Sequence, residues 1–409
     1  MLKRINVEHL RTGMYIHELC GSWMEHPFWR SAFLLKDPQD ISRIADSGIH
    51  EVWIDTAKGL DVAAGRAKEE SDAEVERELI RAAETPLQRI ERVDMAEEVK
   101  RAAKIVAKSK DAVSSMFHEA RMGKALDAND ALPVVEEISN SVARNPGAVI
   151  SLARLKTKDE YTYMHSVAVC ALMVVLSRQL GLDEQQTRDA GLAGLLHDVG
   201  KMMIDDAVLN KPGKLTDEEF TLVKSHPEEG HKLLLDGRNV NATALDVCLH
   251  HHEKIDGSGY PHRLKADEIS LFAKMGAVCD VYDAITSNRP YKAGWDPAES
   301  LRKMAEWAEG HFEQYIFQAF VKSVGIYPTG SLVRLESGRL GVVIEQSTKS
   351  LLTPHVKVFF STRSGVYIAP EMLDLSSPAA NDKIVSREDA TKWGLKNFDE
   401  LWAGAYKPT

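Results

Sequence analysis

Cysteine is scarce in this chain, and its positions form no recognisable motif. Only four cysteines occur among the 409 residues, and none of them belongs to a CxxC pair. Neither a disulfide framework nor a thiolate zinc site is therefore indicated.

The chain also lacks an excess of positive charge and a long apolar run. The formal net charge is −10 and the pI is about 5.9, which argues against a protein that binds nucleic-acid polymers, although a local basic pocket for a small phosphate ligand stays compatible. The apolar run 167–176 is too short to cross a bilayer, and the N-terminus lacks the order of a signal peptide. We therefore expect a soluble, cytoplasmic protein without membrane insertion.

Four segments differ in composition, and together they predict a mainly α protein. Residues 1–64 mix β-like stretches at 5–7, 14–19 and 51–54 with a helix after Pro38, which indicates a small α/β module. Alanine and charged residues dominate the next segment, which predicts helices over residues 65–144. An all-helical domain is expected over residues 145–325, and alternating apolar residues with glycine-bearing turns predict a β-rich C-terminal extension over residues 326–409.

A heptad pattern marks the helical segment before residue 121. Apolar or small residues recur every seven positions at Val99, Val106, Val113 and Ala120, and a second set follows three residues later at Ala102, Ser109 and Met116. Such a seam suits helix pairing and hence a homodimer. An amphipathic helix packed on its own domain gives the same pattern, and the sequence does not separate the two.

Histidine is concentrated in one part of the chain. Eight of the fifteen histidines lie between residues 165 and 262, which argues for a site. His165 begins an apolar helix and, taken alone, is more typical of a core histidine. His197 and Asp198 end another apolar run, whose start is marked by a capping-box pattern (Asp183 and Gln186) and whose end we place at Gly200. An adjacent His and Asp can supply a nitrogen ligand and a bridging carboxylate.

Three further features add to this cluster. His226 directly precedes a proline that suits the first position of a helix, and Asp280 lies in an apolar helix where a metal would satisfy its carboxylate. Each also has an ordinary interpretation, as a turn histidine or as a hydrogen-bonded core acid. The stretch "LHHHEKIDGSGYP" at 249–261 places three histidines before a glycine-spaced turn, either as an exposed polar run or as metal ligands beside an access loop.

Taken in order, these motifs resemble the HD-GYP subgroup of the HD phosphohydrolases, which degrade the bacterial second messenger cyclic di-GMP. The resemblance covers about residues 145–325. It rests on His165, "HDVGK" at 197–201, His226, "HHEKIDGSGYP" from 251 and "DVYDAITSNRPYK" from 280. The opening of the chain is similar to an uncharacterised domain often found in front of such enzymes in proteobacteria, and the β-rich tail resembles an extension of relatives.

The resemblance implies a binuclear metal centre. It assigns one divalent ion to His165, His197, Asp198 and Asp280, and the other to Asp198 as a bridge with His226, His251 and His252. His250 falls outside both sets. Nitrogen and oxygen ligands suit iron or manganese, with nickel and zinc as alternatives. Some relatives hold a third ion through a glutamate four residues before the first histidine, where this chain has Tyr161; Asp159 and Glu160 lie off that helix face, so two ions are expected.

The same resemblance implies the roles of the remaining site residues. Two adjacent cations can activate a water for attack on a phosphodiester phosphorus and can hold the phosphate oxygens. Asp198 and Lys201 would be the catalytic residues, with Lys201 also contacting substrate. Further substrate contacts fall on Arg289 and Lys292 for the second phosphate, and on Gly259, Tyr260 and Pro261 for the guanine-side entrance. Without the resemblance, Arg289 and Lys292 would be interpreted as an exposed basic pair.

Three classes of function stay open. The first is an enzyme that linearises cyclic di-GMP to pGpG, with further cleavage to GMP left undecided. The second is a phosphohydrolase for another cyclic dinucleotide or nucleotide, because the HD core alone serves many substrates. The third is a sensor or adaptor in which the GYP loop, residues 257–261, binds another signalling protein.

Overall fold

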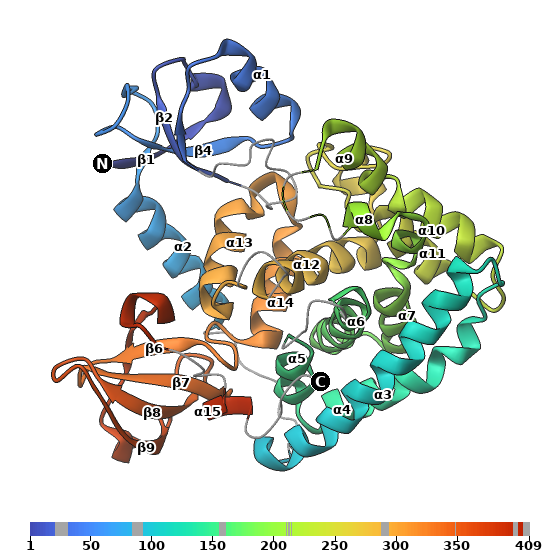
Figure 1. The fold of residues 1–409 in the computed structure, drawn as a ribbon. Coiled ribbons are helices and arrows are strands. Elements are labelled where there is room, and N and C mark those ends of the chain that lie inside the picture. The colour runs from blue at the N-terminus through green and yellow to red at the C-terminus, as the bar shows by residue number, and fades with distance from the viewer. Residues whose placement is uncertain are drawn as a thin grey trace.

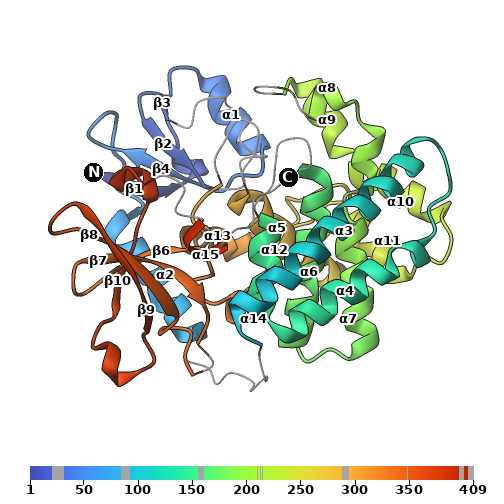
Figure 2. The ribbon, with the colours of Figure 1, turned by 60° about the horizontal axis from the view of Figure 1, so that its bottom comes forward.

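The computed structural model describes residues 1–20, 32–83, 93–154, 161–209, 211, 213, 215–287, 294–347, 349–395 and 400–403. A helical body carries two small antiparallel sheets, and both views place the sheets on the same side of that body (Figure 1 and Figure 2). The predicted class is confirmed: a mainly α protein with an α/β module at the N-terminus and a β-rich extension at the C-terminus.

The N-terminal module is a twisted sheet covered by one helix. Its strands are β1 (Leu2–Asn6), β2 (Tyr15–Leu19), β3 (Phe33–Leu34), β4 (Glu51–Asp55) and β5 (Arg66–Ala67), in the order β3-β2-β4-β1-β5. Helix α1 (Pro38–Asp46) starts where predicted, because the Asp37 side chain accepts a hydrogen bond from the Gln39 amide. The stretches predicted at 14–19 and 51–54 are strands, whereas the first strand ends at Asn6 and Val7 begins a short 3-10 helix.

The helical body fills the middle of the chain. Its elements are α2 (Lys68–Ala83), α3 (Met95–Arg121), α4 (Leu132–Arg144), α5 (Pro146–Arg154), α6 (Tyr161–Gln179), α7 (Glu184–Leu196), the 3-10 helix η4 (Val199–Met203), α8 (Asp206–Leu209), α9 (Asp217–Lys224), α10 (His226–Leu235), α11 (Ala242–His250), α12 (Leu271–Thr286), α13 (Pro297–His311) and α14 (Gln314–Val324). Helix α2 connects the N-terminal module to α13 and α14, on which it packs.

Helix α6 is the central helix of this body. Residues 164–177 are buried on every face, which explains why its sequence is uniformly apolar and not amphipathic. One side of α6 contributes Val167 and Val174 to the core shared with α3, α4 and α5, and the other contributes Leu172 and Leu176 to the core shared with α12 and α14. Among the described residues no helix, α6 included, meets the length and hydropathy of a bilayer span.

The heptad seam of α3 is buried within this chain. Val106, Val113 and Ala120 are at most 3% exposed and belong to the core formed with α4, α5 and α6. Ala102 and Ser109 are buried as well. The seam thus packs on its own domain, the second of the two interpretations.

Helix α7 places His197, its C-cap residue, beside α6 because glycine residues let the two helices approach closely. The capping box at its start is confirmed: the side chains of Asp183 and Gln186 each accept a hydrogen bond from the backbone amide of the other residue. A Cβ at Gly194 would lie 2.9 Å from the Val169 carbonyl, so only glycine lets α7 approach α6 so closely. The predicted stop at Gly200 is wrong: α7 already ends at Leu196, and Gly200 is needed because a Cβ there would lie 2.0 Å from the His226 carbonyl.

The C-terminal extension is a second five-stranded antiparallel sheet. Its strands are β6 (Leu332–Leu335), β7 (Arg339–Glu345), β8 (His355–Ser361), β9 (Val366–Asp374) and β10 (Ile384–Arg387), in the order β10-β6-β7-β8-β9, followed by α15 (Glu400–Ala403). Leu332 of β6 and Leu340 and Val342 of β7 are buried in a core that they share with the helical body. The sheet is thus packed on the core.

The carboxylate of Glu98 joins α3 to α4 and yields a stability prediction. It is fully buried and accepts hydrogen bonds from Ser141 Oγ at 2.7 Å and from Arg144 Nε at 2.7 Å. Burial alone would raise the pKa of Glu98, but these partners lower it below 4.5. Glu98→Gln should therefore cost about 1–3 kcal/mol of unfolding free energy at pH 7, measured by urea denaturation.

A pH series and a neighbouring variant control this prediction. Because the folded-state pKa of Glu98 is lowered, its contribution is present at neutral pH and should be lost progressively as the pH falls from the ordinary glutamate pKa through the lowered folded-state pKa. Glu97, one residue earlier, is exposed, so Glu97→Gln should lower the unfolding free energy of the protein by less than about 0.5 kcal/mol. Equal losses for the two variants would contradict the role given to Glu98.

Candidate metal centre

Seven side chains from five helices and one turn converge in the helical body. The imidazoles are those of His165 in α6, His197 after α7, His226 at the start of α10, and His251 and His252 after α11; the carboxylates are those of Asp198 and Asp280. All except His252 are buried. Their ligand atoms form one group of His165, His197 and Asp280, a second of His226, His251 and His252, and a third that joins His197, Asp198 and His251, each within 4.8 Å. The structure thus brings together every metal ligand predicted from the sequence.

Asp198 stands between the two histidine groups. Its Oδ2 atom lies 3.3 Å from the Nε2 atoms of both His165 and His197. Its Oδ1 atom lies 3.2 Å from His226 Nε2 and 3.8 Å from His251 Nε2. Each oxygen therefore faces a different group, which is the arrangement that a bridging carboxylate needs.

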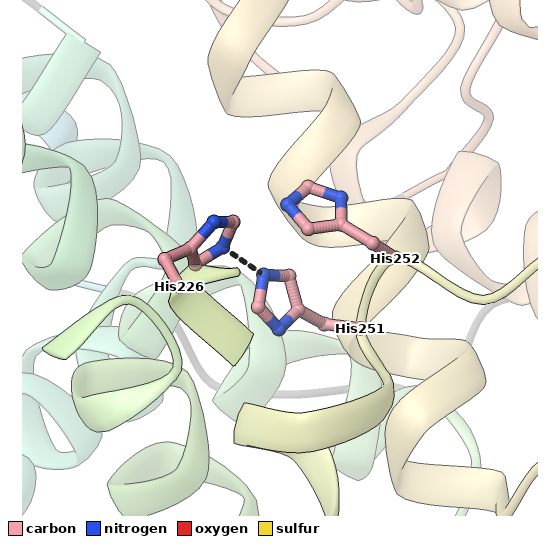
Figure 3. A group of neighbouring side chains, drawn as sticks. All are labelled: His226, His251 and His252. Carbon is pink, nitrogen blue, oxygen red and sulfur yellow. Dashed lines mark hydrogen bonds between the residues drawn. The ribbon is translucent and has the colours of Figure 1, made fainter. Parts of the chain in front are cut away.

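Backbone carbonyls fix the orientation of three of the imidazoles. The Nδ1 atoms of His197, His226 and His251 donate to the carbonyls of Gly194 at 2.8 Å, Val223 at 2.7 Å and Val247 at 3.0 Å. Because a carbonyl only accepts, the proton of a neutral ring sits on Nδ1 and the Nε2 lone pair points into the cluster. His226 Nε2 and His251 Nε2 face each other at 3.3 Å (Figure 3). Two lone pairs at that distance call for a cation between them.

A carboxylate that the sequence analysis missed orients the fourth imidazole. Asp283 Oδ2 lies 2.6 Å from His165 Nδ1, while His165 Nε2 lies 2.9 Å from Asp280 Oδ1. Asp283 follows Asp280 by three residues in α12, a spacing that places both carboxylates on one helix face. The spacing in "DVYD" was the available signal, and carboxylate support of this kind is typical of metal-bound histidine.

The charges of the cluster suit cation binding. Burial opposes ionisation of Asp198, but Lys201 and His197 hold its pKa well below the usual range. Burial would lower the pKa of His197, yet Asp198 and Asp280 raise it to about 10. In the second group, burial and the neighbouring imidazoles lower the pKa of His251 to about 3. The carboxylates thus favour the charged form and His251 the neutral form, which are the forms that bind a cation.

Three buried polar atoms of the cluster have no hydrogen-bond partner among the described residues. They are Asp198 Oδ1, His252 Nε2 and Asp280 Oδ2. An unsatisfied buried polar atom costs about 1–3 kcal/mol, and more when it is charged. All three belong to the cluster, so metal ions would account for them together. The residues present therefore fit a metal centre.

Lys201 and the GYP loop border the cluster. Lys201 Nζ forms an ion pair with Asp198 Oδ2. Tyr260 stacks on His252, with ring centroids 4.6 Å apart and an interplanar angle of 23°, and a cis peptide bond joins it to Pro261. Gly259 lies so close to the preceding chain that a Cβ would be 2.4 Å from the Lys254 amide nitrogen. Arg289 and Lys292, the other predicted substrate contacts, lie outside the described residues.

Glu253, a second residue that the sequence analysis did not single out, closes the GYP loop. Its carboxylate is 2% exposed and accepts the amides of His262 at 2.6 Å and Leu264 at 3.0 Å. These two hydrogen bonds tie residues 262–264, which follow the loop, to Glu253, which precedes it. Its place between the histidines and the loop was the only signal in the sequence.

His250 is turned away from the cluster, although it adjoins two of its members. Its Nδ1 lies 2.8 Å from Asp246 Oδ1, and its Nε2 lies 3.2 Å from His262 Nδ1. This is the position expected of a residue outside the ligand set. Tyr161 is the first residue of α6, but its side chain, like Asp159 and Glu160, lies outside the described part of the chain.

Comparison with known proteins agrees with this geometry. Residues 138–316 match the HD domain family, and residues 2–131 match a domain of unknown function, DUF3391. The chain is 57% identical over 410 residues to the cyclic di-GMP phosphodiesterase PA4108 of Pseudomonas aeruginosa, covering 100% of this chain and 97% of that protein. The chain belongs to the HD-GYP family of cyclic di-GMP phosphodiesterases. It is therefore a phosphodiester hydrolase of the metal-dependent HD type.

Two further relatives match less than half of the chain. The response regulator RpfG of Xanthomonas campestris, a cyclic di-GMP phosphodiesterase, is 47% identical over 123 residues, which are 30% of this chain and 32% of RpfG. The 3'3'-cGAMP-specific phosphodiesterase 3 of Vibrio cholerae is 33% identical over 171 residues, which are 42% of this chain and 37% of that protein. The relatives thus include enzymes named for two different cyclic dinucleotides.

The support of His165 by Asp283 can be tested in this HD-GYP protein by metal binding. Asp283→Asn removes the charge and lets an amide NH2 face the ring, so metal affinity should fall about 10–100-fold, measured by competition with a chelator. Asp246→Asn is the matched control, because Asp246 supports His250 outside the cluster. Equal metal affinity in the two variants would contradict the role of Asp283.

Proposed function

We propose that this protein hydrolyses cyclic di-GMP to linear pGpG at a binuclear metal centre. The observation that carries the proposal is the position of Asp198, whose two carboxylate oxygens face two separate histidine groups. The identity of 57% to a cyclic di-GMP phosphodiesterase over the whole chain supports the choice of substrate. Cleavage of one phosphodiester opens the ring and gives pGpG; a second cleavage would give GMP.

The proposed ligand sets follow the two groups of side chains. His165, His197, Asp198 and Asp280 hold one divalent ion, and Asp198, His226, His251 and His252 hold the other. This mixture of imidazole and carboxylate ligands suits iron or manganese, with nickel and zinc as alternatives. When bound, the two ions lower the pKa of a water molecule and neutralise charge on the phosphate oxygens.

The chain's own residues orient the substrate and balance its charge. Lys201, paired with Asp198, places an ammonium beside the cluster and stabilises the negative charge that grows on the phosphate. Arg289 and Lys292 bind the second phosphate. Gly259, Tyr260 and Pro261 shape the guanine-side entrance, where Tyr260 lies on His252. A water oxygen forms the new bond to phosphorus, and the bond between phosphorus and the ribose 3′ oxygen breaks. The 3′ oxygen takes up a proton from the water and leaves as a hydroxyl.

Two other functions make different predictions for the same site. A Vibrio cholerae relative is named for 3'3'-cGAMP, so a different cyclic dinucleotide is the second candidate. An adaptor that binds a signalling protein through the GYP loop needs no metal ligand. The three unsatisfied ligand atoms favour an enzyme over such an adaptor.

Product analysis tests the proposal. The metal-loaded protein is incubated with cyclic di-GMP, 3'3'-cGAMP and pGpG, and the products are separated by chromatography. We expect pGpG to form fastest from cyclic di-GMP, and Asp198→Ala to lower turnover at least about 100-fold with loss of bound metal. Faster hydrolysis of 3'3'-cGAMP would contradict the proposal that cyclic di-GMP is the substrate. Near-normal turnover of Asp198→Ala with full metal content would overturn the binuclear site.

The three adjacent histidines allow a test of the ligand register. His251→Ala and His252→Ala should each lose metal and most activity, because each removes a proposed ligand. His250→Ala should keep the metal content of the parent, because His250 contacts Asp246 and His262. Metal analysis of the three purified variants decides the matter. Loss of metal in His250→Ala with retention in His252→Ala would show that the register is off by one residue.

A further inference from the structure

We propose that the N-terminal module positions the GYP loop, and that His50 is the positioning residue. This inference rests on the proposed function, because the loop is assigned to the substrate entrance. Nothing in the sequence linked the two parts: His50 precedes β4 of the module, and the loop lies more than 200 residues later. The structure places them in contact.

A single carboxylate joins the module to the loop. His50 Nε2 donates to Asp256 Oδ2 at 2.6 Å, and Asp256 Oδ1 accepts the amide of Ser258 at 2.8 Å. One oxygen of Asp256 therefore fixes the turn that enters the GYP loop, and the other binds the module. Gly48 also adjoins this turn, since a Cβ on it would lie 3.5 Å from the Ser258 carbonyl oxygen.

The module also contacts α13, the helix whose C-terminal end hydrogen-bonds to Asp256. Lys303 in α13 pairs with Glu18 of β2 at 2.8 Å, and the Arg4 guanidinium of β1 donates to the Glu306 carbonyl. The end of α13 is kinked at Gly310, which has φ +84° and whose carbonyl accepts the Asp256 amide at 3.0 Å. Displacement of the module would therefore disturb Asp256 through α13 as well as through His50.

The loop in turn touches the candidate metal centre. Tyr260 stacks on His252, and the Tyr260 amide donates to the His252 carbonyl at 3.2 Å. The contacts thus run from His50 through Asp256 and the loop to Tyr260 and a proposed metal ligand. They connect the module to the loop that is assigned to the substrate entrance.

The boundary between module and catalytic domain is polar and incompletely filled. A cavity there is lined by Arg4, Cys20, His50, Lys254, Asp256 and His311, among others. Interfaces of this polar kind are typical of domains that shift relative to each other. The module is thus suited to pass a displacement to the loop without unfolding of either domain.

The test compares three variants of the full-length, metal-loaded protein. His50→Ala removes the donor to Asp256, and His50→Gln restores an amide donor at a similar reach. His9→Ala is the control, because His9 is an exposed histidine of the same module. Hydrogen–deuterium exchange of the amides of residues 255–264 reports on the loop, and steady-state hydrolysis of cyclic di-GMP reports on substrate entry.

In His50→Ala we expect exchange of these amides to rise about threefold to tenfold and KM to rise by a similar factor. The kcat and metal content should stay close to those of the parent, and His50→Gln should restore most of the loss. His9→Ala should change neither readout. Unchanged exchange in His50→Ala would overturn the contact, and faster exchange without a change in KM would overturn its role in the reaction. A parent protein inactive on cyclic di-GMP would contradict the proposed function instead, and exchange would still decide the contact.

Discussion

The buried carboxylate of Asp198 is the constraint on which the architecture of the helical body depends. A charged group that is 1% exposed is strongly unfavourable unless neighbouring positive charge compensates it. Lys201 supplies that charge, and four imidazoles from helices that are far apart in sequence, those of His165, His197, His226 and His251, lie within 3.8 Å of the Asp198 oxygens. The packing of these helices is therefore also the assembly of the site. Gly194 and Gly200 stand at close approaches where a methyl group would force the elements apart.

Helix ends, more than helix faces, supply the imidazoles. His197 and His251 are the first residues beyond α7 and α11, and His226 is the first residue of α10. Carbonyls in the last turn of a helix can accept side-chain donors: Gly194 accepts the Nδ1 proton of His197, and Val247 accepts both the backbone amide and the Nδ1 proton of His251. The same geometry thus satisfies the backbone and directs the Nε2 lone pairs inward. His165 is different, because it lies within α6 and takes its support from Asp283.

Much of the site could be predicted from the sequence, because its residues lie in ordered motifs with characteristic spacing. Strands β2 and β4 of the N-terminal module and the capping box of α7 were also predictable, since both depend on local patterns. The remaining features depend on tertiary contacts. The heptad of α3 could not show whether its partner was the same chain, and Gly200 read as a helix stop although its purpose is proximity to α10. The contact between His50 and Asp256 joins segments that no local pattern relates.

The central claim is that Asp198 bridges two metal ions between two histidine groups. Anomalous X-ray scattering from crystals of the metal-loaded protein, recorded on both sides of the metal absorption edge, counts and locates the ions directly. The account predicts two peaks per chain, one beside His165 and His197 and the other beside His226 and His251, with an oxygen of Asp198 on each. A single peak, a third peak at the cluster, or two peaks with Asp198 bound to only one of them would contradict it.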